Sequence, residues 1–275
     1  MVSGDPRPIG MFDSGVGGLT VARSVLDLLP HEPMTYFGDT ARSPYGSRPP
    51  EAIRGFAREI ASFLLDRGVK VLVVACNAVE STSIEDLTEQ AHVPVVGVIE
   101  PGVRAAARAT RNGLVGVIGT EATIGSGSYP RAAERQGLDV ELVSAACPAF
   151  VPYVERGDTT SPELLAAAED YLAPLRRAGV DTLVLGCTHY PLLSGLLRVV
   201  MGPDVVLISS AEETARDVYA TLVRDGLLRI EGAPPGHEFL CSGDPADFLA
   251  LGRRFLGPEI EEVRARSVQP ERSGR

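Results

Sequence analysis

The chain has 275 residues and is 44% hydrophobic, which suits a globular protein of one large or two modest domains. A formal net charge of −10 opposes contact with phosphate backbones, so we expect no direct nucleic acid partner. No apolar stretch approaches the roughly 20 residues that span a bilayer, and the first residues lack a signal-peptide pattern. We therefore expect a cytoplasmic protein with no membrane partner.

The cysteine and lysine content narrows the chemistry. The four cysteines, at 76, 147, 187 and 241, are widely spaced and form no C-x-x-C pair. In a reducing compartment this favours catalytic or buried thiols over disulfides. Lys70 is the single lysine against 25 arginines, and it stands at the start of a predicted strand, away from the usual ligand crevice. Pyridoxal phosphate enzymes need a lysine for the Schiff base, so this cofactor is not expected.

Apolar runs of strand length alternate with amphipathic helical patterns, which indicates βαβ units and a parallel sheet. The predicted strands are 8–13, 34–38, 71–76, 94–98, 114–119, 139–144, 181–186 and 204–208. The predicted helices are 18–29, 50–67, 80–91, 101–111, 123–136, 161–178, 190–200 and 211–225.

The second half of the chain repeats the first in outline. Residues 9–15 have a weak counterpart in residues 115–120, and each precedes a cysteine-bearing strand by a similar interval, as in a duplicated domain. Breaks near 98–101 and 208–210 divide the chain. We predict a first α/β domain of residues 1–97 plus 208–265, an inserted second α/β domain of residues 98–207, and a disordered tail of residues 266–275.

Residues 71–77 (VLVVACN) and 182–188 (TLVLGCT) share one pattern. Each is an apolar run that ends in a small residue, a cysteine and a hydrogen-bonding side chain. A cysteine at the carboxyl end of a buried strand lies where open α/β sheets bind ligands. Cys76 and Cys187 therefore predict a site with two opposed thiols, which suits proton transfer across a carbon atom.

Two polar loops follow other predicted strands. In residues 12–18 (FDSGVGG), glycines permit a tight turn, amides at the helix start favour an anion, and Asp13 supplies a carboxylate at the strand end. This loop lacks the G-K-[ST] of a P-loop and the third spaced glycine of the dinucleotide fingerprint. Residues 38–46 place Tyr45 beside Gly46, either as one wall of a pocket or as a plain surface connection.

Residues 187–191 (CTHYP) combine a cysteine and a histidine within one turn. They could be a nucleophile with its base, two metal ligands, or a general base with an assisting acid. Zinc is the weakest of these, because structural zinc sites take four ligands and no further ligand motif is present, so we predict no metal. A thiol hydrolase needs one cysteine and leaves Cys76 unexplained.

Amino-acid racemisation would use both cysteines. Without a cofactor, it requires a base close to one face of the α-carbon and a proton donor on the other face. Thiolate and thiol can exchange these roles between the two directions. Asn77, Thr188 and backbone amides would stabilise the charge that develops on the substrate carboxylate.

Five segments of the chain resemble the motifs of glutamate racemases, in the expected order. They are residues 12–20 (FDSGVGGLT), 38–46 (GDTAR and PYG), 75–77 (ACN), 97–102 (GVIEPG) and 186–193 (GCTHYPLL). The resemblance implies that Cys76 and Cys187 are the alternating acid and base. It implies assisting roles for Asp13 and His189, and a supporting role for the Glu155 carboxylate. The substrate contacts it implies are Asp13, Ser14, Pro44, Tyr45, Gly46, Asn77, Ala78, Thr120, Thr188 and His189.

The resemblance also carries expectations for the whole protein. The implied fold class is α/β, with two pseudo-symmetric flavodoxin-like domains, each a doubly wound and mostly parallel sheet, and the active site between them. The implied activity is cofactor-independent interconversion of L- and D-glutamate, which supplies D-glutamate for peptidoglycan. A homodimer is usual in the family. Two alternatives stay open: a racemase of another amino acid, and a weakly active scaffold with a regulatory role, since some members are reported to inhibit DNA gyrase.

Three positions near the cysteines bear on specificity. His189 favours glutamate, because the related aspartate racemases usually carry an acid there. Ala78 stands where a Thr or Ser normally follows Cys-Asn, and a lost hydroxyl hydrogen bond costs about 0.5–1.5 kcal/mol. Glu80 stands where small residues are expected, and an inward carboxylate would repel an anionic substrate. We therefore expect Glu80 on a solvated helix face.

Overall fold

The computed structural model describes residues 4–231 and 235–268, and within them the strands form two parallel sheets. The first sheet has the order β10-β9-β2-β1-β3-β4. Its strands are Ile9–Asp13 (β1), Met34–Gly38 (β2), Val71–Val74 (β3), Val95–Val96 (β4), His237–Cys241 (β9) and Arg264–Ala265 (β10). The second sheet has the order β6-β5-β7-β8. Its strands are Leu114–Gly119 (β5), Glu141–Ala146 (β6), Thr182–Gly186 (β7) and Val206–Ile208 (β8).

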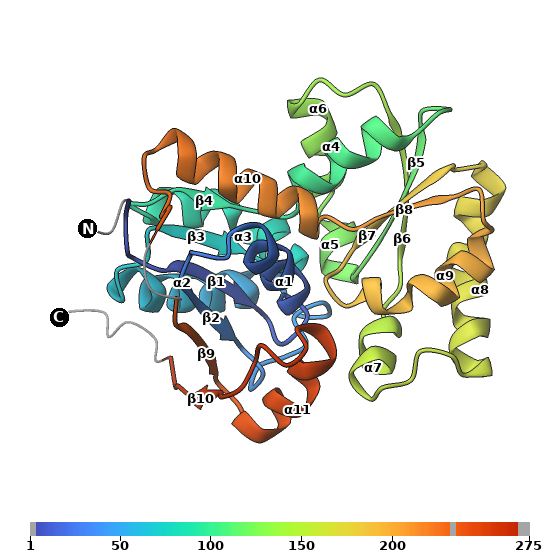
Figure 1. The fold of residues 1–275 in the computed structure, drawn as a ribbon. Helices are drawn as coiled ribbons and strands as arrows, with labels where there is room; N and C mark the ends of the chain where they lie inside the picture. Colours follow the sequence, from blue (N-terminus) through green and yellow to red (C-terminus); the bar gives the residue numbers. More distant parts are fainter. Residues whose placement is uncertain (1–3, 232–234, 269–275) are drawn as a thin grey trace.

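The two sheets repeat one topology, and Figure 1 shows them side by side. The order β2-β1-β3-β4 in the first corresponds to β6-β5-β7-β8 in the second. In each unit, the second strand in sequence adds to one side of the first strand, and the third and fourth add to its other side. Cys76 follows β3, and Cys187 follows the equivalent strand β7. The predicted α/β class with two doubly wound, parallel, pseudo-symmetric units is confirmed. The residue limits predicted for the two domains remain a prediction.

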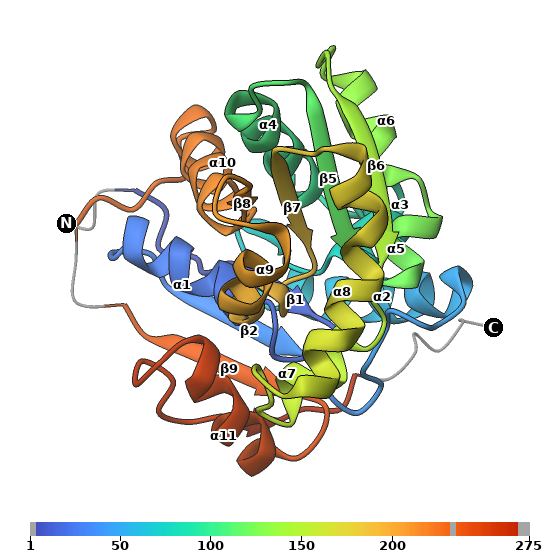
Figure 2. The ribbon, with the colours of Figure 1, turned by 90° about the vertical axis from the view of Figure 1, so that its right-hand side faces the viewer.

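Helices cover both faces of the first sheet (Figures 1 and 2), because its central strands are buried at every position and so on both faces. In β3, Val71 and Val73 belong to a core with the helices Leu19–Leu28 (α1) and Ala211–Arg224 (α10), while Leu72 and Val74 pack with Pro50–Asp66 (α2) and Asn77–Gln90 (α3). The other helices are Ile99–Ala109 (α4), Glu121–Gly125 (α5), Ser128–Arg135 (α6), Phe150–Glu155 (α7), Pro162–Ala178 (α8), Ser194–Met201 (α9) and Pro245–Phe255 (α11), with a 3₁₀ turn at Tyr190–Leu193 (η1).

Several predicted elements need correction. The strand predicted for 71–76 ends at Val74, and the next helix begins at Asn77 rather than at 80, because Cys76 already turns the chain into the helix. The helix predicted for 123–136 is split into α5 and α6, where Gly127 adopts a left-handed conformation (φ +67°). The helix predicted for 190–200 starts as the η1 turn.

The carboxyl-terminal part of the chain returns to the first sheet, where it forms elements that the sequence did not predict. Strand β9 pairs with β2, and α11 packs against β9 and α1. Beyond β10, the Arg266 backbone N–H donates to the Cys241 carbonyl (2.8 Å). Residues 269–275 of the predicted tail lie outside the described residues.

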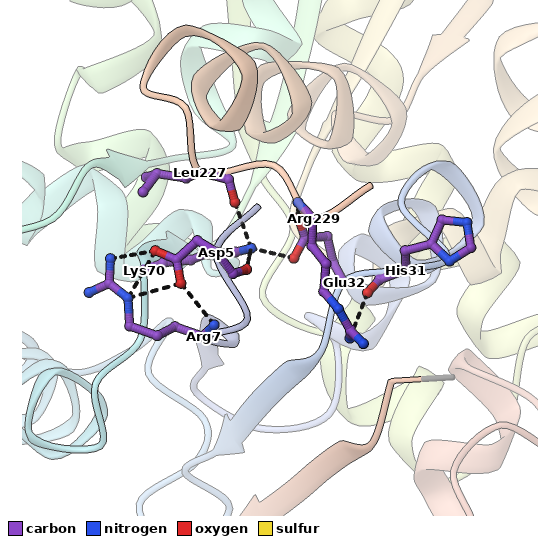
Figure 3. A network of polar contacts seen from close by, with 7 residues as sticks. All are labelled: Asp5, Arg7, His31, Glu32, Lys70, Leu227 and Arg229. Carbon is purple, nitrogen blue, oxygen red and sulfur yellow. Dashed lines mark hydrogen bonds and ion pairs between the residues drawn. The ribbon is translucent and has the colours of Figure 1, made fainter. Parts of the chain in front are cut away.

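Lys70 lies in a buried polar network at the amino ends of the strands (Figure 3). Its Nζ forms an ion pair with Glu32 Oε2 (2.5 Å) and donates to the carbonyls of Asp5 and Leu227 (2.8 Å each). Glu32 Oε1 also accepts from the Arg229 backbone N–H (2.7 Å). The network therefore joins four segments far apart in sequence, at the opposite end of β3 from Cys76.

Candidate active site

A cavity of about 280 Å³ lies at the carboxyl ends of the strands, and its walls come from both sheet units. It is lined by Ser14, Ser43, Pro44, Tyr45, Gly46, Ser47, Cys76, Asn77, Ala78, Thr120, Glu121, Pro148, Val151, Pro152, Cys187, Thr188 and His189. All the sequence-predicted site residues line this cavity except Asp13 and Glu155, which lie behind it. The two cysteines, 111 positions apart in sequence, thus meet in one cavity.

The strand order explains why these residues meet. In a doubly wound sheet, a crevice opens where the chain reverses direction between two neighbouring strands. In the first unit this point lies between β1 and β3, which end at Asp13 and just before Cys76. In the second it lies between β5 and β7, which end just before Thr120 and Cys187. The site is therefore formed by two such crevices that face each other.

Two glycines allow the units to approach closely. A Cβ at Gly17 would lie 2.4 Å from His189 Nδ1 and from Thr188 Oγ1, and a Cβ at Gly46 would lie 2.6 Å from Thr120 Cβ. Such contacts are far shorter than van der Waals distances, so a larger residue at either position would push the units apart. The Ala122 backbone N–H also donates to the Gly46 carbonyl across this junction (3.0 Å).

Cys76 is a buried thiol beside a carboxylate. It is 6% exposed, and its Sγ lies 3.7 Å from Ser14 Oγ. Burial and the negative charge of Asp13 raise the pKa of Cys76 to about 12, while the backbone amides of Val79 and Ser14 favour the thiolate. Cys76 therefore carries its proton at neutral pH.

Cys187 has a different partner. Its Sγ lies 3.9 Å from His189 Nδ1, and His189 Nε2 lies 3.2 Å from Glu155 Oε1. Burial opposes protonation of His189, but its hydrogen bonds with Cys187 and Glu155 outweigh burial and raise its pKa to about 10. The imidazolium favoured at neutral pH is the group that stabilises a neighbouring thiolate. The two cysteines thus have different neighbours, a carboxylate for Cys76 and a charged histidine for Cys187.

Asp13 connects the loop after β1 to the segment after β7. It is 1% exposed, its Oδ1 accepts from the Gly15 backbone N–H (2.7 Å), and its Oδ2 accepts from Thr188 Oγ1 (3.4 Å). Burial raises the pKa of Asp13, and the charge of His189 acts in the opposite direction. Thr188 belongs to the second unit, so this hydrogen bond crosses the junction.

Asn77 is held by a residue that the sequence analysis did not single out. Its Nδ2 donates to Tyr129 Oη (3.0 Å), and Tyr129 comes from α6 of the second unit. Within the described part of the chain, the buried Asn77 Oδ1 has no hydrogen-bond partner. Because Asn77 lines the cavity, this oxygen is available to a donor on a bound molecule.

The loop before α2 is fixed by Asp39, whose role no sequence signal indicated. Tyr45 Oη donates to Asp39 Oδ2, and Arg42 Nε donates to the same oxygen (2.6 Å). Ser242, which follows β9, donates to Asp39 Oδ1 (2.6 Å). The loop is thus a wall of the cavity, which decides between the two readings that the sequence left open.

Pro148, Val151 and Pro152 form an apolar wall that the sequence analysis also missed. Isolated apolar residues in a loop and a short helix carry no periodic signal that would distinguish a cavity wall from core packing. Ser43, Ser47 and Glu121 complete the lining.

The expectation for Glu80 was wrong. Its side chain is buried, with 6% exposure, and its Oε2 accepts hydrogen bonds from the backbone N–H groups of Val98 and Ile99. The carboxylate points away from the substrate cavity, which it does not line. Glu80 therefore avoids repulsion with an anionic substrate by capping another helix rather than by facing solvent.

A profile of the Asp/Glu/Hydantoin racemase family matches residues 19–218. The chain is 56% identical over 257 residues to a glutamate racemase of Parafrankia, covering 93% of both chains, and 52% identical over 266 residues to one of Mycobacterium tuberculosis, covering 96% and 97%. The chain belongs to this family. The resemblance to glutamate racemases in the sequence motifs is confirmed.

Solved structures of family members have the same fold. A glutamate racemase from Thermus thermophilus, in complex with beta-chloro-D-alanine, matches with a TM-score of 0.85 at 48% identity, covering 96% and 98% of the two chains. One from Francisella tularensis, in complex with D-glutamate, matches with a TM-score of 0.90 at 34% identity, covering 96% and 98%. An aspartate racemase of Picrophilus torridus shares the fold with a TM-score of 0.55 at 18% identity.

Two further features of the described residues concern membranes and metals. None of the helices in residues 4–231 and 235–268 is both long and apolar enough to cross a membrane. In the same ranges, no group of three or more His, Cys, Asp and Glu side chains is arranged to hold a metal ion.

Proposed function

We propose that the protein interconverts L- and D-glutamate without a cofactor, with Cys76 and Cys187 as the two bases, and supplies D-glutamate for peptidoglycan. The observation that carries the proposal is that two buried cysteines, from equivalent positions of two repeated units, line one cavity. A thiol hydrolase would need only one of them. The membership of the family and the glutamate racemases among its relatives support glutamate as the substrate.

The chemical step is a proton exchange between two faces of one carbon. With the α-carbon between the thiols, one thiolate takes the Cα proton as the C–H bond breaks and an S–H bond forms. The other thiol then delivers its proton to the opposite face, as its S–H bond breaks and a new Cα–H bond forms. One thiol and one thiolate are present before and after, so the reaction balances and the roles reverse for the other enantiomer.

The surroundings of the thiols fit these roles. Cys76, whose raised pKa keeps its proton in place at neutral pH, is suited to act as the acid, and Cys187, whose Sγ lies 3.9 Å from the charged His189 ring, is suited to act as the base. Glu155 orients the His189 ring through its contact with Nε2 and, together with Cys187, favours the charged form of the ring. Asp13 acts on Cys76 by its charge, and it contacts the segment that carries Cys187 through its hydrogen bond with Thr188.

Hydroxyl, amide and imidazole groups would hold the substrate. Among the residues that the structure describes, no arginine or lysine lines the cavity, so the substrate carboxylates would be bound by hydroxyl and amide groups and by the amino-terminal end of α3. The candidates are Ser14, Tyr45, Gly46, Asn77, Thr120, Thr188 and His189, with Pro44 and Ala78 as packing contacts. The unpaired Asn77 Oδ1 is an acceptor suited to the substrate ammonium group.

The test is racemisation of pure L- and D-glutamate by the purified protein without added cofactor, followed by chiral chromatography. We expect both enantiomers to reach a mixture, and expect aspartate to react far more slowly. Cys76→Ala and Cys187→Ala should each lower kcat by about 10²-fold or more, because each removes one proton-transfer group. Cys241→Ala, a buried cysteine outside the cavity, is the matched control and should keep the wild-type rate.

Full activity of either active-site variant would contradict the two-base proposal, and preference for another amino acid would contradict the substrate. The homodimer, the cytoplasmic location and the gyrase partner stay predictions. Light scattering of the purified protein and a supercoiling assay would test the first and the last.

A further inference from the structure

Glu80 is a buried carboxylate that the proposed reaction does not use. It lies in the first turn of α3, directly after the residues that carry the chemistry, and its backbone N–H donates to the Cys76 carbonyl (2.9 Å). Asn77 and Ala78, in the same turn, line the substrate cavity. A displacement of Glu80 would therefore displace the turn that positions Cys76.

The partners of this carboxylate lie where the chain passes from the first sheet to the second unit. Oε2 accepts from the backbone N–H groups of Val98 and of Ile99 (2.8 Å), the residues that start α4 just after β4. Helix α4 packs against β7, the strand that precedes Cys187. Glu80 thus connects the turn after one cysteine to a helix that supports the other.

The crossing is shaped to receive this side chain. A Cβ at Gly97 would lie 2.3 Å from the Glu80 carboxyl carbon, so a larger residue would leave no room for the carboxylate. The first N–H groups of an α-helix lack partners within the helix, and a carboxylate at that end satisfies them and interacts favourably with the helix dipole. Here the cap comes from another helix, so it joins two units rather than stabilising one.

We propose that Glu80 is a positioning residue, which holds the start of α4 against the Cys76 turn and thereby sets the placement of the two thiols relative to each other. The inference rests on the proposed two-base reaction. It assigns to Glu80 a role that is indirect, through the backbone at 98–99, because the side chain does not line the substrate cavity.

The hydrogen bonds that Glu80 accepts from residues 98 and 99 should depend on pH. Burial raises the pKa of Glu80 to about 7, against the effect of the Val98 and Ile99 amides. The ionisable groups that face it are Glu100 of α4, Tyr129, Arg131 and Arg135 of α6, Arg54 of α2, and Glu85 and Asp86 of α3. The ionised carboxylate accepts hydrogen bonds more strongly than the protonated acid, so the connection should be tighter above pH 7 than below it.

The kinetic test compares wild type with Glu80→Gln and Glu80→Ala between pH 5.5 and 9, using α-protonated and α-deuterated glutamate. The glutamine is isosteric with the protonated acid, so we expect Glu80→Gln to match wild type near pH 5.5 and to lose about tenfold in kcat at pH 8.5, the loss expected for charged hydrogen bonds. Glu80→Ala should lose more at every pH. The isotope effect on kcat should rise in both variants at pH 8.5, because misplaced thiols slow proton transfer.

Glu85→Gln is the matched control, since Glu85 is an exposed carboxylate on the same helix. Like Glu80, it lines a small polar pocket between α2, α3 and α6 that is separate from the substrate cavity. We expect it to keep the wild-type rate and isotope effect. The proposal attributes the lower kcat and the larger isotope effect to loss of the contact with residues 98 and 99. An equal loss of kcat in Glu85→Gln, or an unchanged kcat and isotope effect in Glu80→Gln at pH 8.5, would therefore overturn it.

Hydrogen–deuterium exchange without substrate separates this proposal from the proposed function. At pH 8.5, where Glu80 is ionised, we expect faster exchange of the Val98 and Ile99 amides in Glu80→Gln and Glu80→Ala than in wild type or Glu85→Gln. Unchanged exchange would show that Glu80 does not hold the backbone at residues 98 and 99. If the wild type fails to racemise glutamate, the proposed function fails, and the exchange result still decides whether Glu80 makes this connection.

Discussion

At the scale of single residues, the two thiols are chemically unequal. Cys76 faces the Asp13 carboxylate and carries a raised pKa, whereas Cys187 faces a histidine that Glu155 keeps charged. Motifs at strand ends predicted the two cysteines and Asp13, and the resemblance to glutamate racemases implied the roles of His189 and Glu155. Neither predicted how the charged neighbours of the two thiols differ, because that depends on distances across the junction of two units.

The charged state of His189 should appear in the pH dependence of stability. Its pKa is about 10 in the folded protein and near 6.5 when exposed, so the stabilisation is fully present below pH 6.5 and is lost as the pH rises through 10. Between pH 6 and pH 10, the free energy of unfolding measured with urea should fall less for His189→Asn than for wild type. His92→Asn, at an exposed position, is the control and should follow wild type. Parallel declines in all three proteins would refute a charged His189.

At the scale of elements, hydrophobic periodicity predicted the strands that position the site, because β1, β3, β5 and β7 are nearly continuous apolar runs. It missed β9, which begins with the exposed His237 and the partly buried Glu238. It also placed Glu80 in solvent, because the helical pattern of α3 is weak and the partner amides lie 18 and 19 positions further along. Contacts of that range have no local signature.

The missed strand has a consequence for the site. Ser242, just after β9, donates to Asp39, which holds Tyr45 in the cavity wall. Ser242→Ala should raise KM for glutamate about fivefold with little change in kcat, because one lost hydrogen bond is worth about 1 kcal/mol and the thiols are untouched. Initial-rate kinetics in both directions would measure this. Ser267→Ala, at an exposed position, should leave KM unchanged. A change in kcat alone would contradict a role in substrate binding.

At the scale of the molecule, two ends of the sheets have different tasks. The carboxyl ends line the candidate active site, and the amino end of β3 carries the Lys70 network, which joins Asp5, Glu32 and the segment after α10. The sequence predicted Lys70 at the start of a strand, away from the ligand crevice, and the structure places it directly before β3. Its partners were not predictable, since Glu32 and Leu227 lie in loops far from it in sequence.

Loss of the Lys70 charge should destabilise the protein without altering the chemistry. Lys70→Met leaves the buried Glu32 carboxylate without its ion-pair partner, which commonly costs about 3–5 kcal/mol in the free energy of unfolding. Denaturant unfolding would measure the loss, and kcat per folded molecule should stay at the wild-type value. Arg7→Met removes a more exposed charge from the same region and should cost far less. Equal stability of the two variants would contradict a stabilising role for the buried pair.

The central claim is that two thiols act on opposite faces of one carbon. The most direct test is racemisation of each glutamate enantiomer in deuterium oxide, with the label at Cα followed by mass spectrometry in substrate and product separately at early times. Two bases predict that the product contains deuterium from the first turnovers while the recovered substrate remains unlabelled, in both directions. Deuterium in the recovered substrate at the rate of racemisation, or transfer of the substrate's own proton into the product, would show a single base and contradict the account.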